Sequence, residues 1–167
     1  MEVGTSSVQM LPYTASSVGL ARRRLLGDLT EAGVHEATVC DASLILSELI
    51  SNALRHASPL PGGLVRVSWR LSGDCVEIAV GDGGGPTEPV VNKPAAGALG
   101  GRGLGIVDRL SLRWGAYTRQ DGGETTVWAE IALRSEDDRH RAGMAEHGPG
   151  GHRGTGPGLV IASSRDA

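Results

Sequence analysis

The sequence predicts an α/β protein, a two-layer sandwich in which helices cover one face of a mixed, mostly antiparallel β-sheet. Long segments with apolar residues at helical spacing indicate one layer, and shorter segments that alternate apolar and polar residues indicate the other. The chain has 167 residues, of which 40% are hydrophobic, enough to bury one core. We therefore expect one domain over residues 8–134, between a flexible N-terminus at 1–7 and a disordered Gly-rich tail at 135–167.

The helical patterns lie in the N-terminal half of this domain. An edge strand at 8–11 precedes a first helix that runs from residue 16 or 17 to about residue 30. Residues 36–57 form the second and longest helix. The residues expected to face the core from the two helices are Val18, Ala21, Leu25, Leu29, Leu46, Leu49, Ile50 and Ala53.

The strand patterns follow. Residues 64–71 and 75–80 are separated by three residues that include Gly73, a spacing typical of a β-hairpin. Residues 83–101 are rich in Gly, Pro and Ala and have the composition of a mobile loop. The domain is completed by a helix at 103–112 and by strands near 113–117 and 126–133.

One polar stripe of the second helix has the side chains of a ligand site. Glu48, Asn52 and Arg55 are spaced so that all three fall on one helix face. A carboxylate, a carboxamide and a cation in line can serve as a base, an oxygen ligand for Mg²⁺ and a phosphate partner. An ordinary amphipathic helix also shows an exposed polar stripe, so the stripe alone leaves both interpretations open.

Three further segments favour the ligand site. Asp82 follows the apolar strand at 76–80 and opens a run of glycines. Glycines at 101–105 come directly before an apolar helix, where backbone amides can hold a phosphate. Thr125 and Thr126 begin the last strand. A plain turn at Asp82 or a glycine hinge at 101–105 would explain one feature, whereas a ligand site with a bound phosphate explains the whole series.

The order of these motifs resembles the GHKL (Bergerat) ATP-binding fold shared by gyrase, MutL and histidine kinases. Its compact form is similar to the bacterial anti-sigma-factor serine/threonine kinases. The shared motifs are Glu-x-x-x-Asn on a helix, Asp-x-Gly at a strand end, Gly-x-Gly-x-Gly before a helix and Thr-Thr-Val on a strand. Here they are carried by Ser47–Ala57, Gly81–Pro86, Gly101–Val107 and Thr125–Glu130, within residues 8–134.

The resemblance implies ATP and Mg²⁺ as cofactors. It implies that Asp82 accepts a hydrogen bond from the adenine amine, with Thr125 and Gly84 at the same end of the nucleotide. It also implies that Asn52 binds Mg²⁺ between the phosphates and that Arg55 pairs with a phosphate oxygen.

The resemblance further assigns the chemical step and the phosphate loop. Glu48 would be the catalytic residue that orients or deprotonates the attacking hydroxyl. Residues 83–101 would form a lid over ATP. The residues expected to hold the phosphates are Gly101, Arg102, Gly103, Leu104 and Gly105.

Two residues depart from the motif pattern. Pro86 replaces the second glycine of the Asp-x-Gly-x-Gly motif, and Glu124 stands where a glycine often precedes the threonine. Glu124 is expected to add a negative charge near the pocket, and both changes are expected to weaken nucleotide binding.

We expect a cytoplasmic protein kinase that phosphorylates a small anti-sigma-factor antagonist protein and sequesters a sigma factor. A homodimer agrees with the family. The alternative is a module that binds its partner in an ATP-dependent way without phosphorylating it. Glu48 favours the kinase, whereas Pro86 and Glu124 favour the binding module.

Composition argues against other classes of partner. The net charge is −3, which disfavours nucleic acid, and no apolar run approaches the roughly 20 residues that span a bilayer. Arg22, Arg23 and Arg24 form either a solvated basic turn or a docking surface for an acidic partner, a role to which the first helix of the resembling kinases contributes. Cys40 and Cys75 are expected to be reduced thiols packed in or near the core.

Overall fold

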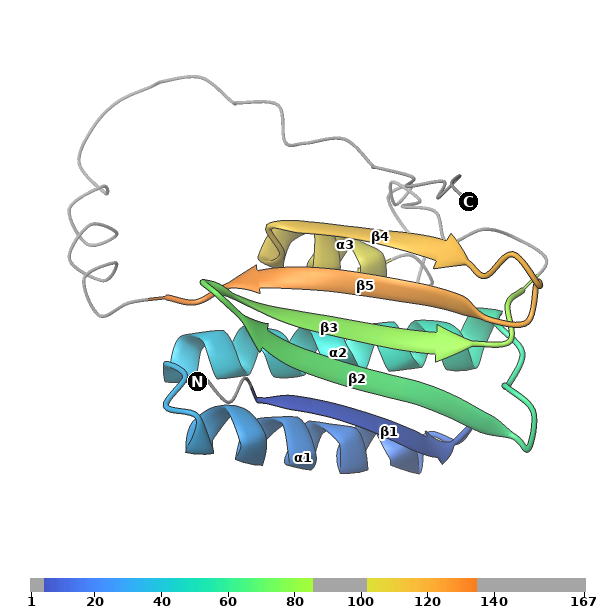
Figure 1. The fold of residues 1–167 in the computed structure, drawn as a ribbon, viewed down its shortest axis with the longest axis horizontal. Coiled ribbons are helices and arrows are strands. Elements are labelled where there is room, and N and C mark those ends of the chain that lie inside the picture. Colours follow the sequence, from blue (N-terminus) through green and yellow to red (C-terminus); the bar gives the residue numbers. More distant parts are fainter. Residues whose placement is uncertain (1–4, 86–101, 135–167) are drawn as a thin grey trace, which may run out of the picture.

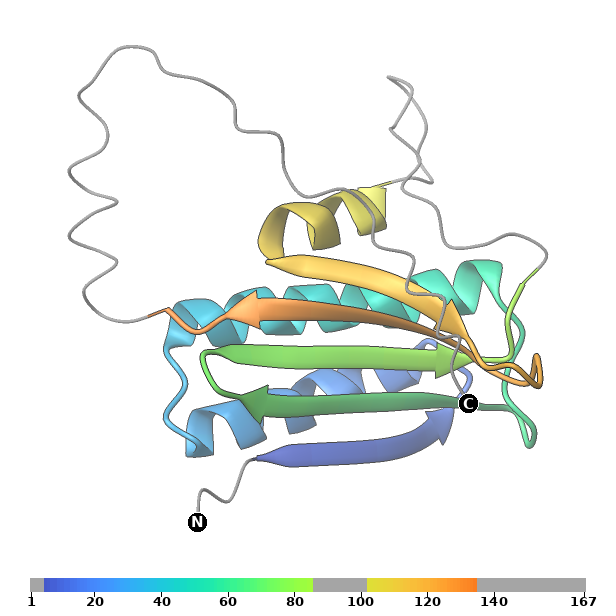
Figure 2. The same ribbon diagram turned by 45° about the horizontal axis from the view of Figure 1, so that its top comes forward.

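A computed structural model describes residues 5–85 and 102–134. Helices lie on one face of a five-stranded sheet with the order β1-β2-β3-β5-β4, as Figures 1 and 2 show. The predicted two-layer α/β sandwich is therefore confirmed. The elements are β1 (Ser6–Pro12), α1 (Ser16–Glu31), α2 (Glu36–His56), β2 (Leu64–Ser72), β3 (Cys75–Asp82), α3 (Arg102–Leu110), β4 (Arg113–Thr118) and β5 (Thr125–Ala132). Residues 86–101 of the lid predicted at 83–101, and the tail predicted at 135–167, lie outside the described residues.

The sheet is antiparallel in each of its described pairings, so the predicted mixed sheet is wrong in this detail. The chain crosses from β3 through α3 to β4, so β3 and β4 run in the same direction and would form a parallel pair if they were neighbours. β5 then turns back from β4 and pairs with both β3 and β4, which separates them. The hairpin between β2 and β3 turns at Gly73, whose φ is +57°.

The core lies between the sheet and one side of α2. The helix residues expected to face the core are buried, except that Val18 is only half-buried. They pack against alternating residues of the central strands, such as Val65, Val67, Ile78 and Val80. α2 contacts α1, α3, β3 and β5, so it connects the other two helices to each other and to the centre of the sheet.

The two cysteines differ from the expectation. Both are free thiols, but Cys40 is exposed and Cys75 is half-buried. Cys40 lies on α2 one turn before Leu44, which is 43% exposed, so both residues face away from the sheet. The expectation of a packed thiol is therefore wrong for Cys40.

α2 also has the length and hydropathy of a possible membrane span, alone among the helices of the described residues. Half of the relevant window is buried inside the protein. A core helix has these same properties, and the contacts of α2 with both layers account for its apolar composition.

The packing of α2 gives a first prediction. Leu46 is fully buried, so Leu46→Ala should lower the free energy of unfolding by about 2–5 kcal/mol through lost burial and the cavity that remains. The same change at the exposed Leu44 should cost less than about 0.5 kcal/mol. Urea unfolding followed by circular dichroism measures both values. Equal losses at the two positions would contradict the assigned rotation of α2.

Candidate functional site

The polar stripe of α2 faces the side of the helix where β5 and α3 lie. Asp41 lies on the same stripe as Glu48, two turns earlier, and its carboxylate is 2.9 Å from the Arg134 guanidinium, just after β5. Ser43 lies on the opposite side, where its hydroxyl accepts a hydrogen bond of 3.2 Å from Arg22 of α1. Because α2 also packs against α3, the stripe is directed toward the β5–α3 side of the helix.

Three predicted site residues lie on this stripe. Glu48 and Asn52 are half-buried, and neither makes a hydrogen bond or ion pair with any side chain in the described parts of the chain. Arg55 is exposed, and its Nε donates to the backbone carbonyl of Ser51 at 3.2 Å. The structure therefore brings these residues together with their functional groups available to a ligand.

A buried carboxylate lies at the end of β3. Asp82 is 4% exposed and continues the series of Ile78 and Val80, which face the helices. Its cross-strand partner is Thr125 at the start of β5, so the two side chains lie on the same sheet face. Asp82 and Thr125 are thus brought together, as predicted.

The loop after Asp82 is attached to the C-terminal end of α2. The Ser58 amide donates to the Gly84 carbonyl, and the Gly83 amide donates to the Ser58 carbonyl, both at 2.8 Å. A Cβ on Gly83 would lie 2.4 Å from the Pro59 carbonyl oxygen, so no larger residue fits without a shift of the backbone. These contacts fix Asp82 relative to the helix that carries Asn52.

Burial controls the ionisation of Asp82. Removal from water raises the pKa of this carboxyl above its ordinary value, and the negative charge of Glu124 raises the pKa further. The Gly84 amide, which donates to Oδ1 at 2.7 Å, acts in the opposite direction and lowers the pKa. The second carboxylate oxygen has no hydrogen bond to the described residues and remains available as an acceptor.

Thr125 and Gly84 lie against each other beside Asp82. Gly84 has a φ of +78°, and a Cβ added there would approach the Thr125 hydroxyl to 3.3 Å. The Thr125 hydroxyl also shares a hydrogen bond of 2.9 Å with the Thr118 hydroxyl across the β4–β5 pair. Thr118 was not predicted as a site residue, because its position opposite Thr125 follows from strand register.

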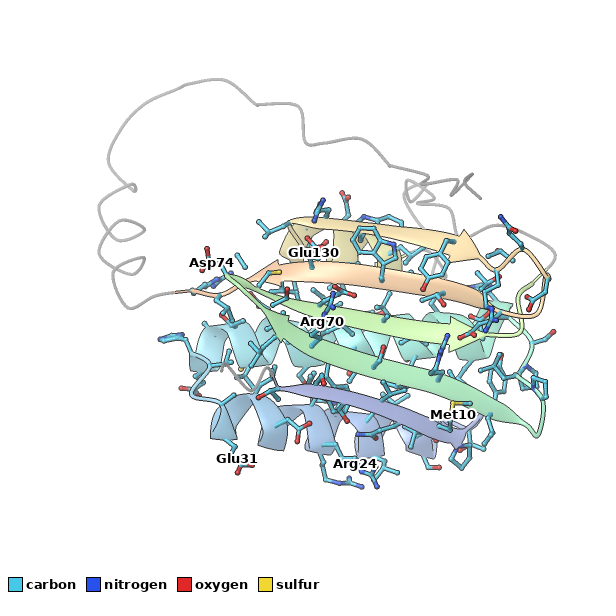
Figure 3. All side chains as sticks on the ribbon, viewed as in Figure 1. Met10, Arg24, Glu31, Arg70, Asp74 and Glu130 are labelled. Carbon is cyan, nitrogen blue, oxygen red and sulfur yellow. The ribbon has the colours of Figure 1, made fainter. Side chains whose placement is uncertain are left out.

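Glu124 lies on the other face of the sheet from Asp82. Its carboxylate pairs with the Arg66 guanidinium above Gly81, on the face away from the helices. Figure 3 shows Arg70 and Glu130 on this same face. The negative charge of Glu124 therefore contributes to the raised pKa of Asp82, as expected of a charge near the pocket. The Glu124 carboxylate itself pairs with Arg66 and does not enter the helix-covered side of the sheet.

The predicted phosphate segment forms the start of α3. Arg102, Gly103, Leu104 and Gly105 lie in the first turns of this helix, and Leu104 is buried. A Cβ on Gly105 would meet nothing within 4 Å among the described residues. Gly101 lies outside the described residues.

The oxygen atoms at this site suit a Mg²⁺ ion that phosphates also bind, and they do not suit a metal ion bound by protein side chains alone. Within residues 5–85 and 102–134 there is no group of three His, Cys, Asp or Glu side chains that could hold a metal ion. Mg²⁺ keeps several waters and needs few protein ligands when phosphates supply the others. The unpaired amide oxygen of Asn52 fits that requirement.

This arrangement, a one-sided antiparallel sheet with Asp82 at a strand end and a Glu/Asn stripe on the covering helix, defines a class of nucleotide-binding domain. Residues 11–131 match the histidine kinase-like ATPase domain family. The chain belongs to this family, which confirms the resemblance to the GHKL fold.

A solved structure shows the same fold. The crystal structure of the RsbU and RsbW domains of Rv1364c from Mycobacterium tuberculosis superimposes with a TM-score of 0.60 and 22% sequence identity. The match covers 78% of this chain and 33% of that chain, so this protein spans a third of the length of its structural neighbour. Comparison with curated protein sequences gives no significant match.

The raised pKa of Asp82 gives a prediction for stability. A carboxyl whose pKa is higher in the folded state stabilises the fold fully below its ordinary pKa of 3.8, and this contribution is lost as the pH rises through the folded-state pKa. An asparagine can keep the bond to the Gly84 amide and carries no charge. Asp82→Asn should therefore gain stability relative to the parent protein as the pH rises from about 4 to 7.

Urea unfolding at a series of pH values measures this difference. Asp74→Asn is the matched control, because Asp74 is an exposed carboxylate in the β2–β3 turn. A stability difference between Asp82→Asn and the parent that does not change with pH would contradict the assignment.

Proposed function

We propose that the protein binds ATP and acts as a serine/threonine kinase of the anti-sigma-factor type. The observation that carries the proposal is the position of Glu48 and Asn52 on α2, where neither has a side-chain partner among the described residues and both face the side that also holds α3 and β5. A half-buried carboxylate and a half-buried amide side by side, with no side-chain partner among the described residues, favour a ligand as their partner. Family membership and the shared fold support ATP as the ligand.

Asp82 would recognise the adenine. Its free carboxylate oxygen can accept a hydrogen bond from the exocyclic amine, a donor that guanine lacks at the equivalent position. Thr125, oriented by the hydroxyl of Thr118, would bind the adjacent ring edge directly or through water. The polar groups at this end are thus held before the nucleotide arrives.

The phosphates would lie between α2 and the start of α3. The first amides of α3 lack partners within the helix and carry a partial positive charge that favours anions. Arg55, on the α2 stripe, adds a positive charge near this end. Mg²⁺, bound through Asn52, would neutralise charge on the β- and γ-phosphates.

Glu48 would act on the protein hydroxyl that receives the phosphoryl group. As a general base it takes the hydroxyl proton while the seryl or threonyl oxygen forms a bond to the γ-phosphorus. The bond between the γ-phosphorus and its bridging oxygen breaks, and ADP leaves with the electron pair. The product is a phosphoserine or phosphothreonine with about two added negative charges, which would weaken its binding to the kinase.

The partner surface would include α1. A groove of about 230 Å³ between α1 and α2 is lined by apolar and basic groups, namely Gly19, Arg22, Arg23, Leu26 and Ser43. Leu26 is 50% exposed, and none of the neighbouring arginines pairs with a carboxylate of the described residues. These features support a partner with an acidic surface, which we propose is the antagonist protein or the sigma factor.

The second candidate function is ATP-dependent partner binding without phosphotransfer. Burial and, to a smaller extent, the negative charge of Glu124 raise the pKa of Asp82 and so oppose the ionised form that binds adenine. Weaker nucleotide binding would slow turnover, which leaves room for this alternative. The pairing of Glu124 with Arg66 reduces that effect, which leaves the kinase as the better-supported proposal.

ATP binding is tested by calorimetry with ATP and Mg²⁺. The parent protein should show saturable binding, and Asp82→Asn should lose at least about tenfold in affinity because an amide nitrogen or a neutral oxygen replaces the carboxylate acceptor. Asp74→Asn should bind like the parent. Absence of binding by the folded parent protein would refute the nucleotide site.

Phosphotransfer is tested with γ-labelled ATP and small antagonist proteins from the same organism, assayed singly. Glu48→Ala should retain ATP binding and lose about 10² to 10⁴ in the rate of transfer, the usual contribution of a general base. Glu31→Ala removes an exposed carboxylate on α1 and should leave the rate unchanged. If the parent binds ATP and partner but transfers no phosphate, the non-catalytic function replaces the kinase.

A further inference from the structure

Tyr13 connects the N-terminal strand to the C-terminal end of α2. It lies between β1 and α1, and its hydroxyl is 2.6 Å from the Ala53 carbonyl oxygen and 2.5 Å from the Ala57 carbonyl oxygen. The phenol has one proton, so the two carbonyls share a single donor. The Tyr13 amide donates to the Gly63 carbonyl at 2.9 Å, which fixes the residue from its backbone as well.

The Tyr13 hydroxyl binds carbonyl groups at the C-terminal end of α2. The last carbonyls of an α-helix have no partner within the helix, and the end must be held by other groups. The chain leaves α2 at Ala57, which has an extended conformation, and the Ala57 amide donates to the Ala53 carbonyl at 2.9 Å. Tyr13 therefore holds both ends of the last turn of α2.

The same turn supports both halves of the nucleotide site. Asn52 immediately precedes Ala53, so its backbone adjoins the turn that Tyr13 binds. On the other side, Ser58 makes the two 2.8 Å backbone bonds that hold the loop after Asp82. Asp82 is close enough to Tyr13 for its charge to raise the pKa of the phenol, second to the effect of burial.

We infer that Tyr13 is a positioning residue of the nucleotide site, whose hydroxyl fixes the distance between Asn52 on α2 and Asp82 at the end of β3. The inference rests on the proposed function, because it assigns Asn52 to the phosphates and Asp82 to adenine. A ligand that reaches both residues depends on their separation, whereas a ligand that reaches only Asp82 does not. Tyr13 would thus affect ATP more than adenosine.

The test is Tyr13→Phe, which keeps the ring packed against the core and removes only the hydroxyl. Binding of ATP with Mg²⁺ should weaken about tenfold, as expected for the loss of one hydrogen bond at a buried helix end. Adenosine binding should change less than about twofold, so the ratio of the two affinities is the readout. Tyr117→Phe is the matched control, since Tyr117 is 48% exposed and its hydroxyl has no hydrogen bond to the described residues.

Amide hydrogen exchange gives a second readout that requires no nucleotide. In Tyr13→Phe, the amides of Ala57, Ser58 and Gly83 should exchange about tenfold faster than in Tyr117→Phe, while the amides of β2 and β3 within the sheet stay protected. Uniformly faster exchange would show a loss of global stability and would overturn the positioning role.

The outcomes separate the inference from the proposed function. If the parent binds ATP, an unchanged ATP affinity in Tyr13→Phe, or equal losses for ATP and adenosine, overturns the role of Tyr13. If the parent binds no ATP, the proposed function fails, and with it the link from Tyr13 to nucleotide. Exchange at Ser58 and Gly83 then decides alone whether Tyr13 holds the Asp82 loop on α2.

Discussion

The rotation of α2 about its axis is the constraint on which the site depends. Its buried stripe, which includes Leu46, Leu49 and Ile50, is almost completely removed from water against the sheet. A helix has 3.6 residues per turn, so this burial also fixes where Glu48 and Asn52 point. A rotation that moved them would expose several leucine and isoleucine side chains, each worth about 1.5–3 kcal/mol of burial. The helical period therefore fixes both the core packing and the site geometry, because the site residues lie one or two positions away from the buried ones in the sequence.

Asp82 shows the opposite relation between stability and function. The core-facing series of β3 continues to a carboxylate at its end, where another apolar residue would pack without loss. The fold limits the cost through the Gly84 amide and through the attachment of the loop to Ser58. The second oxygen has no donor among the described residues, although a second donor would stabilise the charge. The ionised Asp82 carboxylate is therefore less stable without a ligand than with a ligand that donates a hydrogen bond to its second oxygen.

The sequence alone predicts much of this structure, and the limits have physical causes. Every helix and strand of the described residues was predicted to within about two residues, because each one has a helical or alternating apolar pattern. Pairs that lie close on one element, such as Glu48 and Asn52, were also found. The hydroxyl of Tyr13 on Ala53 joins residues 40 positions apart, and the pairing of Arg66 with Glu124 joins residues 58 apart. Such contacts depend on strand order and register, which local periodicity does not contain.

The glycines around the site have different functions, although they look alike in the sequence. Gly83 and Gly85 are required by the protein itself, because a Cβ on either would lie 2.4 Å from a carbonyl oxygen, that of Pro59 after α2 for Gly83 and that of His56 at the end of α2 for Gly85. Gly105 meets no described atom within 4 Å, and in a helix it costs about 1 kcal/mol relative to alanine. Packing within the described chain therefore gives no reason for a glycine at this position. The proposed phosphate would account for it, because a phosphate held by backbone amides approaches the first turn of α3 more closely than a methyl group would permit.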